Sequence, residues 1–274
     1  MKSFLKLSAI LGLCLSLAAC SSNEYKTNES YRIPVVRYIG KKPVTPVDKT
    51  IVLGVNNPQD LYLAIKKANN TKQRVRIVMT PGFYSINQTI ILPGNAILTT
   101  FNPANGGVDG PWLISGEQKD DFVGPVVLMH SGSVINGVNI KQLSSNPALE
   151  IKRLPVTVKS LQLQTVKDQS LMFIESPLVG DKNGVLTLNG VTLTNMYLHK
   201  TAPSIRVGYS APIEVNFIDS VVNYPKGQLI MPKTTKINSV NSTFNTDLSG
   251  LNNIKLKASS YHETNKLKLG IVAR

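Results

Sequence analysis

The chain has 274 residues, of which 42% are hydrophobic and 17% are charged, and its formal net charge at pH 7 is +14. This length is enough for one domain to bury a hydrophobic core, so a small scaffold that depends on disulfides is excluded. The single tryptophan argues against an extended aromatic platform for sugars. The strong excess of basic side chains favours anionic partners.

Residues 1–19 are predicted to be a secretory signal peptide. Lys2 and Lys6 give a positive start, and the apolar run 7–17 is too short to span a bilayer. The run ends in Leu17-Ala18-Ala19-Cys20, which resembles the lipobox of bacterial lipoproteins. The resemblance implies cleavage before Cys20, two acyl chains on its thiol and a third on the new amine, which together would anchor the protein in a membrane. The alternative is an ordinary signal in which Cys20 is incidental.

The residues around the cleavage site also bear on location and partners. By the same resemblance, Ser21 implies sorting to the outer membrane of the cell envelope. Cys14 leaves with the signal and Cys20 is acylated, so the exported domain is predicted to contain no disulfide. The mature chain keeps 28 basic and 16 acidic side chains, a net charge of +12. We expect an anionic polysaccharide or lipopolysaccharide as partner, or else a basic surface with no particular partner, and we find no signal for specific nucleic-acid binding.

Residues 20–50 are predicted to be a lipidated tether, because they are rich in Ser, Asn, Lys and Pro. The domain is predicted over residues 51–274 and begins with a helix at 57–68. Asn57 can cap this helix, and Pro58 suits its first turn. Three apolar side chains would share one helix face: Leu61, Ile65 and Ala68.

Beyond the helix the sequence predicts strands, first at 75–79 and 88–92 on either side of a turn at 80–84. From residue 133 onward, one pattern recurs five times, with inward side chains at x, x+2, x+5 and x+7. The copies begin at residues 133, 156, 186, 215 and 237, which are 23, 30, 29 and 22 residues apart. A two-residue bend such as Asn189-Gly190 divides each copy, and a third strand starts 14 to 19 residues after the start of the copy. The inward pairs of the third strands are predicted as Leu149/Ile151, Leu171/Phe173, Ile205/Val207, Leu229/Met231 and Ile254/Leu256.

Three short strands in each repeat predict an all-β fold, a right-handed parallel β-helix with a short N-terminal capping helix. In this fold the bend turns the chain from one sheet to the next, and variation in length falls in one loop of each coil. The alternative is an antiparallel sandwich, which also has many short strands. A sandwich would require a hairpin signal at every turn and would not explain one triple pattern that recurs five times.

The domain resembles the pectin-lyase-like superfamily of right-handed parallel β-helices. The resemblance rests on the helix 60–68, on the Pro81-Gly82-Phe83-Tyr84 turn with the strand 90–92, and on the coil at 186–195, and it covers roughly residues 57–257. It implies that the helix closes the open end of the solenoid. It carries no catalytic motif, so it implies little about activity.

Enzymes of this fold need carboxylates or basic groups that project from neighbouring coils. Along the first and second strands, the predicted outward residues include no Asp or Glu, so a carboxylate pair for hydrolysis and an oxygen cage for Ca²⁺ are both missing there. The third strands are more charged. Arg206, Lys152 and Lys255 are candidate ligand-binding residues on this face, with Met172 and Ile230 expected beside Arg206. A lyase could use a basic residue here, whereas a solvated strand face is the simpler interpretation.

A second candidate site is the long loop at residues 101–125, because long loops are often functional. It holds Trp112 and a group of acids that includes Asp120 and Asp121, and it could bind a sugar or a cation. The alternative is a simple excursion between coils in which Trp112 packs inward. The histidines, His130, His199 and His262, lack the spacing of metal ligands, so we predict no metal site and no cofactor.

Together these observations predict a lipid-anchored envelope protein with a non-catalytic β-helix. It would bind or organise anionic glycans or serve a structural role in the envelope. The alternative function is a polysaccharide lyase or glycoside hydrolase of the same fold.

Overall fold

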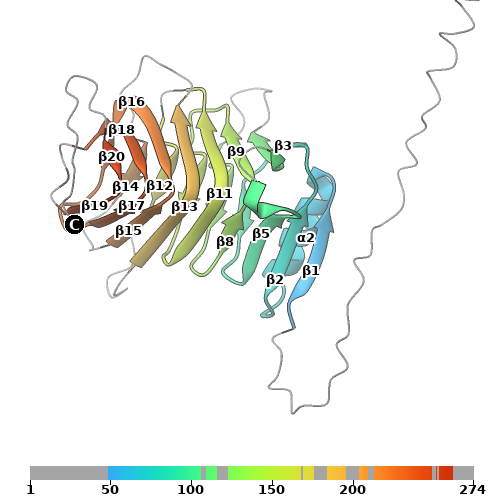
Figure 1. Ribbon diagram of the computed structural model, residues 1–274. Helices are drawn as coiled ribbons and strands as arrows, with labels where there is room; N and C mark the ends of the chain where they lie inside the picture. The colour runs from blue at the N-terminus through green and yellow to red at the C-terminus, as the bar shows by residue number, and fades with distance from the viewer. Residues whose placement is uncertain are drawn as a thin grey trace, which may run out of the picture. The chain divides into compact units, whose positions relative to one another are not determined.

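The computed structural model describes residues 49–105, 109–115, 123–167, 169–175, 184–195, 204–208, 213–248, 251 and 253–261 (Figure 1). All of them belong to one compact unit, residues 40–274. The predicted signal peptide, Cys20 and nearly all of the predicted tether lie outside the described residues. No helix within the described residues is long and apolar enough to cross a membrane.

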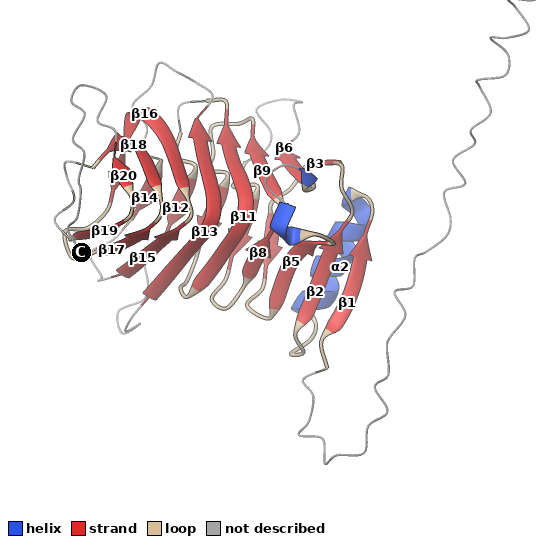
Figure 2. Ribbon diagram, in the orientation of Figure 1, coloured by secondary structure: helices blue, strands red, loops and turns tan. Residues whose placement is uncertain are grey.

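The described residues form 20 strands and one α-helix, together with a short 3-10 turn, η2 (Pro103–Asn105). The strands fall into three stacks, in which each strand pairs in parallel with its counterpart in the next coil (Figures 1 and 2). The first stack contains β1 (Ile51–Val55), β2 (Val75–Met79), β5 (Ala96–Thr100), β8 (Val134–Asn136), the first halves of β11 (Val156–Thr165) and β13 (Gly184–Asn195), β15 (Ile213–Ile218), β17 (Lys236–Val240) and β19 (Ile254–Lys257).

The other two stacks follow the same order along the chain. The second stack contains β3 (Phe83–Ile86), β6 (Trp112–Ser115), β9 (Asn139–Gln142), the second halves of β11 and β13, the start of β16 (Val221–Ile230), β18 (Thr243–Asp247) and β20 (Ser260–Tyr261). The third contains β4 (Ile90–Leu92), β7 (Val127–Met129), β10 (Leu149–Ile151), β12 (Met172–Ile174), β14 (Ile205–Val207) and the end of β16. The predicted all-β, parallel, solenoid-like arrangement is confirmed.

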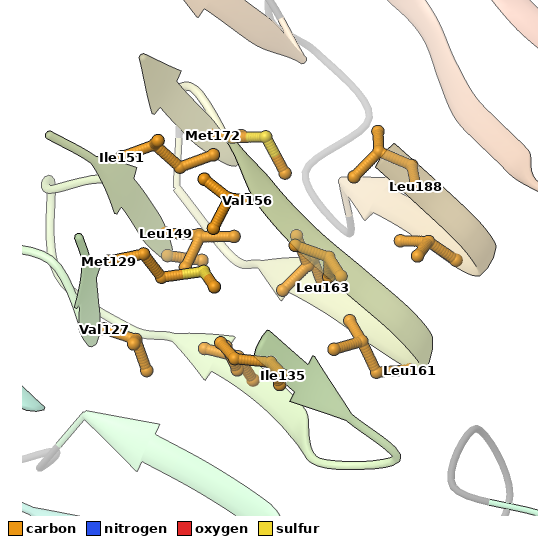
Figure 3. Close-up of a cluster of buried hydrophobic side chains, with 14 of the residues drawn as sticks. Val127, Met129, Ile135, Leu149, Ile151, Val156, Leu161, Leu163, Met172 and Leu188 are labelled. Carbon is orange, nitrogen blue, oxygen red and sulfur yellow. The ribbon is translucent and has the colours of Figure 1, made fainter. Parts of the chain in front are cut away.

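The core is a column of apolar side chains that runs along the inside of the stacks. All the inward positions predicted in the five copies are buried. The register places Leu98, Ile135, Val158, Leu188 and Phe217 one above another in the first stack, each fully buried. Figure 3 shows side chains of all three stacks pointing into this interior. Burial of this continuous column is the main stabilising contribution to the coils.

A sharp bend connects the first stack to the second, and its backbone conformation repeats. Ser160, Asp219, Asn241 and Ala258 have positive φ angles of 49°, 49°, 51° and 49° at this bend, and two glycines complete the series, Gly137 and Gly190. Asn and Asp tolerate the left-handed region better than most residues, and glycine adopts it without strain. The recurring conformation explains why a bend of about two residues suffices in these six coils.

Serine side chains continue the hydrogen bonding past this bend. The backbone N–H of Val191 donates to Ser220 Oγ at 3.2 Å, that of Ser220 to Ser242 Oγ at 3.0 Å, and that of Ser242 to Ser259 Oγ at 3.1 Å. Ser220 and Ser242 are both buried. A buried N–H without a partner is costly, so these inward serines supply the acceptors that the bend removes from the backbone.

The helix α2 (Pro58–Asn69) forms where it was predicted. The side chain of Asn57 accepts a hydrogen bond from the N–H of Asp60 at 2.9 Å, and Pro58 occupies the first turn. The buried face of α2 consists of Leu61, Ala64, Ile65 and Ala68, which belong to the same hydrophobic cluster as the first coils. The helix lies against β1 and β2 (Figure 2).

Two predictions about the third strands are wrong. In β12, Met172 and Ile174 point inward and Phe173 points outward, because Leu171 is buried in the turn that precedes the strand. The strand with Ile254 and Leu256 is β19, which pairs with β17 in the first stack and therefore begins a new coil. The sequence also left β5 and β6 unassigned, although β6 lies within the long loop predicted at 101–125.

Candidate functional site

Polar side chains line the outward face of the first stack in the later coils. The strand register places Thr187 beside Asn216, and Asn216 beside Asn238. The amide nitrogen of Asn238 donates to Asn216 Oδ1 at 2.9 Å and to Glu214 Oε1 at 3.1 Å. These bonds hold the amides in fixed orientations on a regular sheet surface.

Three lysines extend this face, and we call Lys236, Lys255 and Lys257 the lysine group. Lys255 and Lys257 are two residues apart on β19, so they project from the same face of the strand. Lys255 lies beside Asn238, and Lys236 lies on the adjacent strand β17. All three side chains are exposed. The sequence placed Lys255 on the third strand, on the same face as Arg206 and one coil beyond Ile230, and the pairing of β19 with β17 corrects this prediction.

The lysine group keeps its positive charge available. Within the described residues, both ion pairs belong to Lys152 and neither involves the lysine group. Glu214 is the strand neighbour of Lys236; its carboxylate accepts a hydrogen bond from Asn238 and forms no ion pair with that lysine. The three ammonium groups come from two neighbouring strands, whose backbones are about 4.8 Å apart. They can therefore contact one anionic polymer at several points.

Lys152 lies on the outward side of the third stack, where it bridges two glutamates. Lys152 Nζ is 3.1 Å from Glu150 Oε1 and also forms an ion pair with Glu175 Oε1. The two carboxyl groups hydrogen-bond to each other as well. The sequence proposed Lys152 as a ligand-binding residue, but its charge is already balanced by these neighbours. Glu175 was missed because it follows β12 in a segment with no strand pattern.

The environment of this cluster separates the pKa values of its carboxyl groups. Burial raises the pKa of Glu150, and the hydrogen bond with Glu175 adds to the rise although Lys152 opposes it. Burial acts in the same direction on Glu175, but the hydrogen bonds with Lys152 and Glu150 outweigh it and lower its pKa. The hydrogen bond to Glu175 raises the pKa of Lys152, so its ammonium group stays charged at neutral pH.

Arg206 is exposed on β14 in the same stack. Its strand neighbours are Phe173 and Ile230, so Phe173 takes the place that the sequence assigned to Met172. The ring of Phe173 packs close to Gly208, because a Cβ built on Gly208 would lie 3.2 Å from the ring. Arg206 therefore has an aromatic neighbour on one side and an aliphatic one on the other, and Phe173 separates it from Glu150.

Trp112 begins β6 and faces outward, because Leu113 and Ser115 are the buried residues of that strand. The interpretation in which Trp112 packs inward is therefore wrong. Trp112 lies between Phe83 of β3 and Asn139 of β9 in the strand register. The predicted acidic residues Asp120 and Asp121 lie outside the described residues, so the structure does not bring them into a site with Trp112.

The part of the chain that the structure describes contains no group of three or more His, Cys, Asp or Glu side chains arranged to hold a metal ion. Comparisons of the chain with protein-family models, with curated proteins and with solved structures found no match.

Proposed function

We propose that this chain is a lipid-anchored protein of the bacterial outer membrane whose domain binds an anionic glycan without cleaving it. The proposed anchor rests on the lipobox-like residues that end in Cys20. The proposed domain is a right-handed parallel β-helix of the pectin-lyase-like superfamily, with α2 as its N-terminal cap. The parallel pairing of successive coils and the apolar face of α2 in their core support this description.

The lysine group is the observation that carries the proposal. Lys236, Lys255 and Lys257 project from adjacent strands, are exposed and have no described ion pair. The amides of Asn216 and Asn238 lie on the same face and supply hydrogen-bonding groups for hydroxyls or carboxylates. A polymer with negative charges fits a group of cations on a regular sheet surface, and the mature net charge of +12 adds a general attraction.

The geometry of the clustered carboxylates favours binding without cleavage. Glycosidases place two carboxyl groups about 5–5.5 Å or 6.5–9.5 Å apart on either side of the bond that breaks. Glu150 and Glu175 instead share the ammonium of Lys152. Both carboxyl groups are therefore engaged by one cation of the same cluster, which is not the arrangement of a pair that flanks a substrate bond.

One observation favours a second candidate, a glycoside hydrolase. The pKa of Glu150 is raised and that of Glu175 is lowered, which is the separation that an acid and a base or nucleophile need. The exposed Arg206 lies two coils from Glu150 in the same stack. Release of reducing ends from a polysaccharide, abolished by both Glu150→Gln and Glu175→Gln, would establish this function in place of the first.

The proposed binding is tested with the mature protein, polygalacturonate and lipopolysaccharide. The triple variant Lys236→Gln/Lys255→Gln/Lys257→Gln should lose about tenfold or more in affinity at low salt, because three exposed charge contacts are removed. The wild-type affinity should fall steeply between 0.1 M and 1 M salt, as the Debye length drops from about 10 Å to about 3 Å.

A matched control removes the same charge elsewhere. Lys66, Lys67 and Lys72 are exposed at the end of α2 and just beyond it. The variant Lys66→Gln/Lys67→Gln/Lys72→Gln should bind nearly as well as the wild type. Equal losses in the two triple variants would indicate attraction by net charge alone and would overturn the assignment to the lysine group.

A further inference from the structure

The outward face of the second stack differs in character from the lysine-bearing face of the first. Its residues are exposed or half-buried for the most part, and they form two columns that run from coil to coil. One column contains Phe83, Trp112, Asn139, Gln162, Thr192, Val221, Thr243 and Ser260. The other contains Ser85, Ile114, Lys141, Gln164, Thr194, Asn223 and Asn245.

Two aromatic side chains occupy the first coils of this face. Phe83 is 79% exposed, and its partner in the strand register is Trp112, which is half-buried. The N–H of Trp112 donates to the carbonyl of Gly82 at 2.8 Å, which fixes the two strands against each other. A large exposed aromatic ring beside a second one on a rigid sheet forms an apolar surface of the kind that marks binding sites.

Amide and hydroxyl side chains follow the aromatic pair. Gln164 Nε2 donates to Gln162 Oε1 at 3.0 Å, and Asn245 Nδ2 donates to Asn223 Oδ1 at 2.9 Å. Gln164 and Asn245 each use one of their two N–H donors in these bonds, and Asn223 uses one lone pair, so these three amides retain hydrogen-bonding capacity toward solvent. Asn139 is the exception, because it is fully buried and its amide nitrogen lies 3.5 Å from Gly110 O. The column that begins at Ser85 is continuous past this point.

The charge on this face excludes a strongly anionic partner. Among the described residues of the two columns, Lys141 is the one charged side chain, and none is an Asp or Glu. Nucleic acids and other polyanions require several cations to neutralise their phosphates. An uncharged ligand with both an apolar face and hydroxyl groups matches the aromatic pair and the amides.

We propose that the outward face of the second stack binds a neutral glycan. A pyranose ring lies with its C–H face on Phe83 and Trp112, and hydroxyls of the following sugar units hydrogen-bond to Gln164, Asn223 and Asn245. Successive coils are about 4.8 Å apart, so the column from Ile114 to Asn245 extends for about 24 Å, enough for an oligosaccharide along the stack. This site is separate from the lysine group and takes a different class of ligand.

Trp112 provides the test, because it is the single tryptophan of the chain. The mature protein is titrated with the neutral hexasaccharides of the cello, chito, malto and manno series in 1 M salt, and tryptophan emission is recorded. At least one of them should change the emission with saturation, because neutral binding does not depend on charge. If none of the four does so, the proposal is overturned.

Variants test the residues that form the site. Phe83→Ala should weaken binding by about tenfold, and Asn223→Ala/Asn245→Ala by a similar factor, while the thermal transition stays cooperative. Leu63→Ala removes another strongly exposed apolar side chain, 65% exposed on α2, and should bind as the wild type does. Unchanged affinity in Phe83→Ala overturns the proposal.

Binding of the neutral glycan should not depend on the lysine group. The triple lysine variant should retain its Trp112 response to the neutral hexasaccharide, whereas its polygalacturonate binding is lost. Quenching of Trp112 by oligo-deoxythymidine with a steep salt dependence, and by no neutral sugar, would assign the aromatic pair to nucleic-acid bases and overturn the neutral-glycan assignment.

Discussion

Gly94 lies where the backbones of two coils approach each other closely. A Cβ built on Gly94 would lie 2.1 Å from the carbonyl oxygen of Ser131, a backbone atom that cannot rotate away. Gly132 is also close, with its own Cβ position 2.9 Å from the carbonyl oxygen of Gly94 and a φ of +88°. These two glycines allow the turn after the third stack to nest against the same turn of the next coil.

We expect Gly94→Ala to lower the free energy of unfolding by about 1–3 kcal/mol or more, because overpacking against a backbone atom forces the coils apart. Gly54→Ala is the control, since a Cβ on Gly54 has no atom within 4 Å. It should leave stability unchanged or slightly raised. Urea denaturation of both variants checks this, and equal midpoints would contradict the close approach.

The cluster of Glu150, Lys152 and Glu175 should give the stability an unusual dependence on pH. The lowered pKa of Glu175 means that its stabilising contribution is present above the ordinary carboxyl pKa and is lost as the pH falls through the folded value. The raised pKa of Glu150 has the opposite sign, so its contribution is present at low pH and is lost as the pH rises through the folded value.

Glu175→Gln should therefore be less stable than the wild type at pH 7, by at most about 1 kcal/mol for a half-exposed ion pair. The deficit should shrink as the pH falls below about 4. Glu150→Gln should show the reverse slope and improve relative to the wild type as the pH rises from about 4 to 7. Denaturation of the three proteins over this range provides the measurement, and parallel curves would show that the two carboxyls do not differ.

At the scale of the strand, the first and second stacks were predictable from residue 133 onward, and the third was predictable only in part. From β8 onward a short bend of constant length separates the first two strands of each coil, so the inward positions keep the same spacing in each copy, whereas residues 101–111 separate β5 from β6. The loop before the third strand varies in length, and the apolar run Leu171–Ile174 fits either register. The structure resolves the choice by burying Leu171 in the turn and leaving Phe173 outward.

The same variation limited the prediction of candidate sites. Lys255 fitted the allowed spacing of a third strand, yet it belongs to the first stack and so meets Lys236. Phe83 and Trp112 are separated by an insertion, and only strand pairing shows that they are neighbours. A site built from different coils depends on the length of every intervening loop, which periodicity does not specify.

We expect Leu188→Asp to unfold the domain. Leu188 is fully buried between Val158 and Phe217, and an unpaired charge there costs several kcal/mol, on the order of half the stability of a typical domain. Thr187→Asp changes the adjacent residue, which faces outward, and should remain folded. Circular dichroism and thermal melting distinguish the two, and similar losses in both would argue against this register.

At the scale of the whole molecule, the proposed anchor and the proposed binding faces act together. A protein held by acyl chains at Cys20 would present its lysine group and its second-stack face within the envelope, where several weak contacts along one polymer add up. In this proposal the anchor would determine where binding occurs, and the faces would determine what is bound.

Cys20→Ser should move the protein from the membrane fraction to the soluble fraction and should abolish acylation. The thiol is the attachment point implied by the lipobox-like sequence, and serine cannot replace it. Cell fractionation and intact mass measure the change. An unaltered distribution and mass would show that Cys20 is not the anchor.

The parallel register has a consequence for how such a molecule changes in evolution. Each coil meets the next through equivalent positions, as Leu188 meets Phe217 and Phe217 meets Ser239. Removal of the whole coil 213–234, which is the 22-residue offset between β15 and β17, would bring Leu188 directly against Ser239 with the alternation of inward and outward residues intact. Loss of one residue from a strand would instead reverse every following side chain. Length in this architecture is thus a discrete quantity, gained or lost by duplication or deletion of entire coils, and each step lengthens or shortens the binding faces by about 4.8 Å.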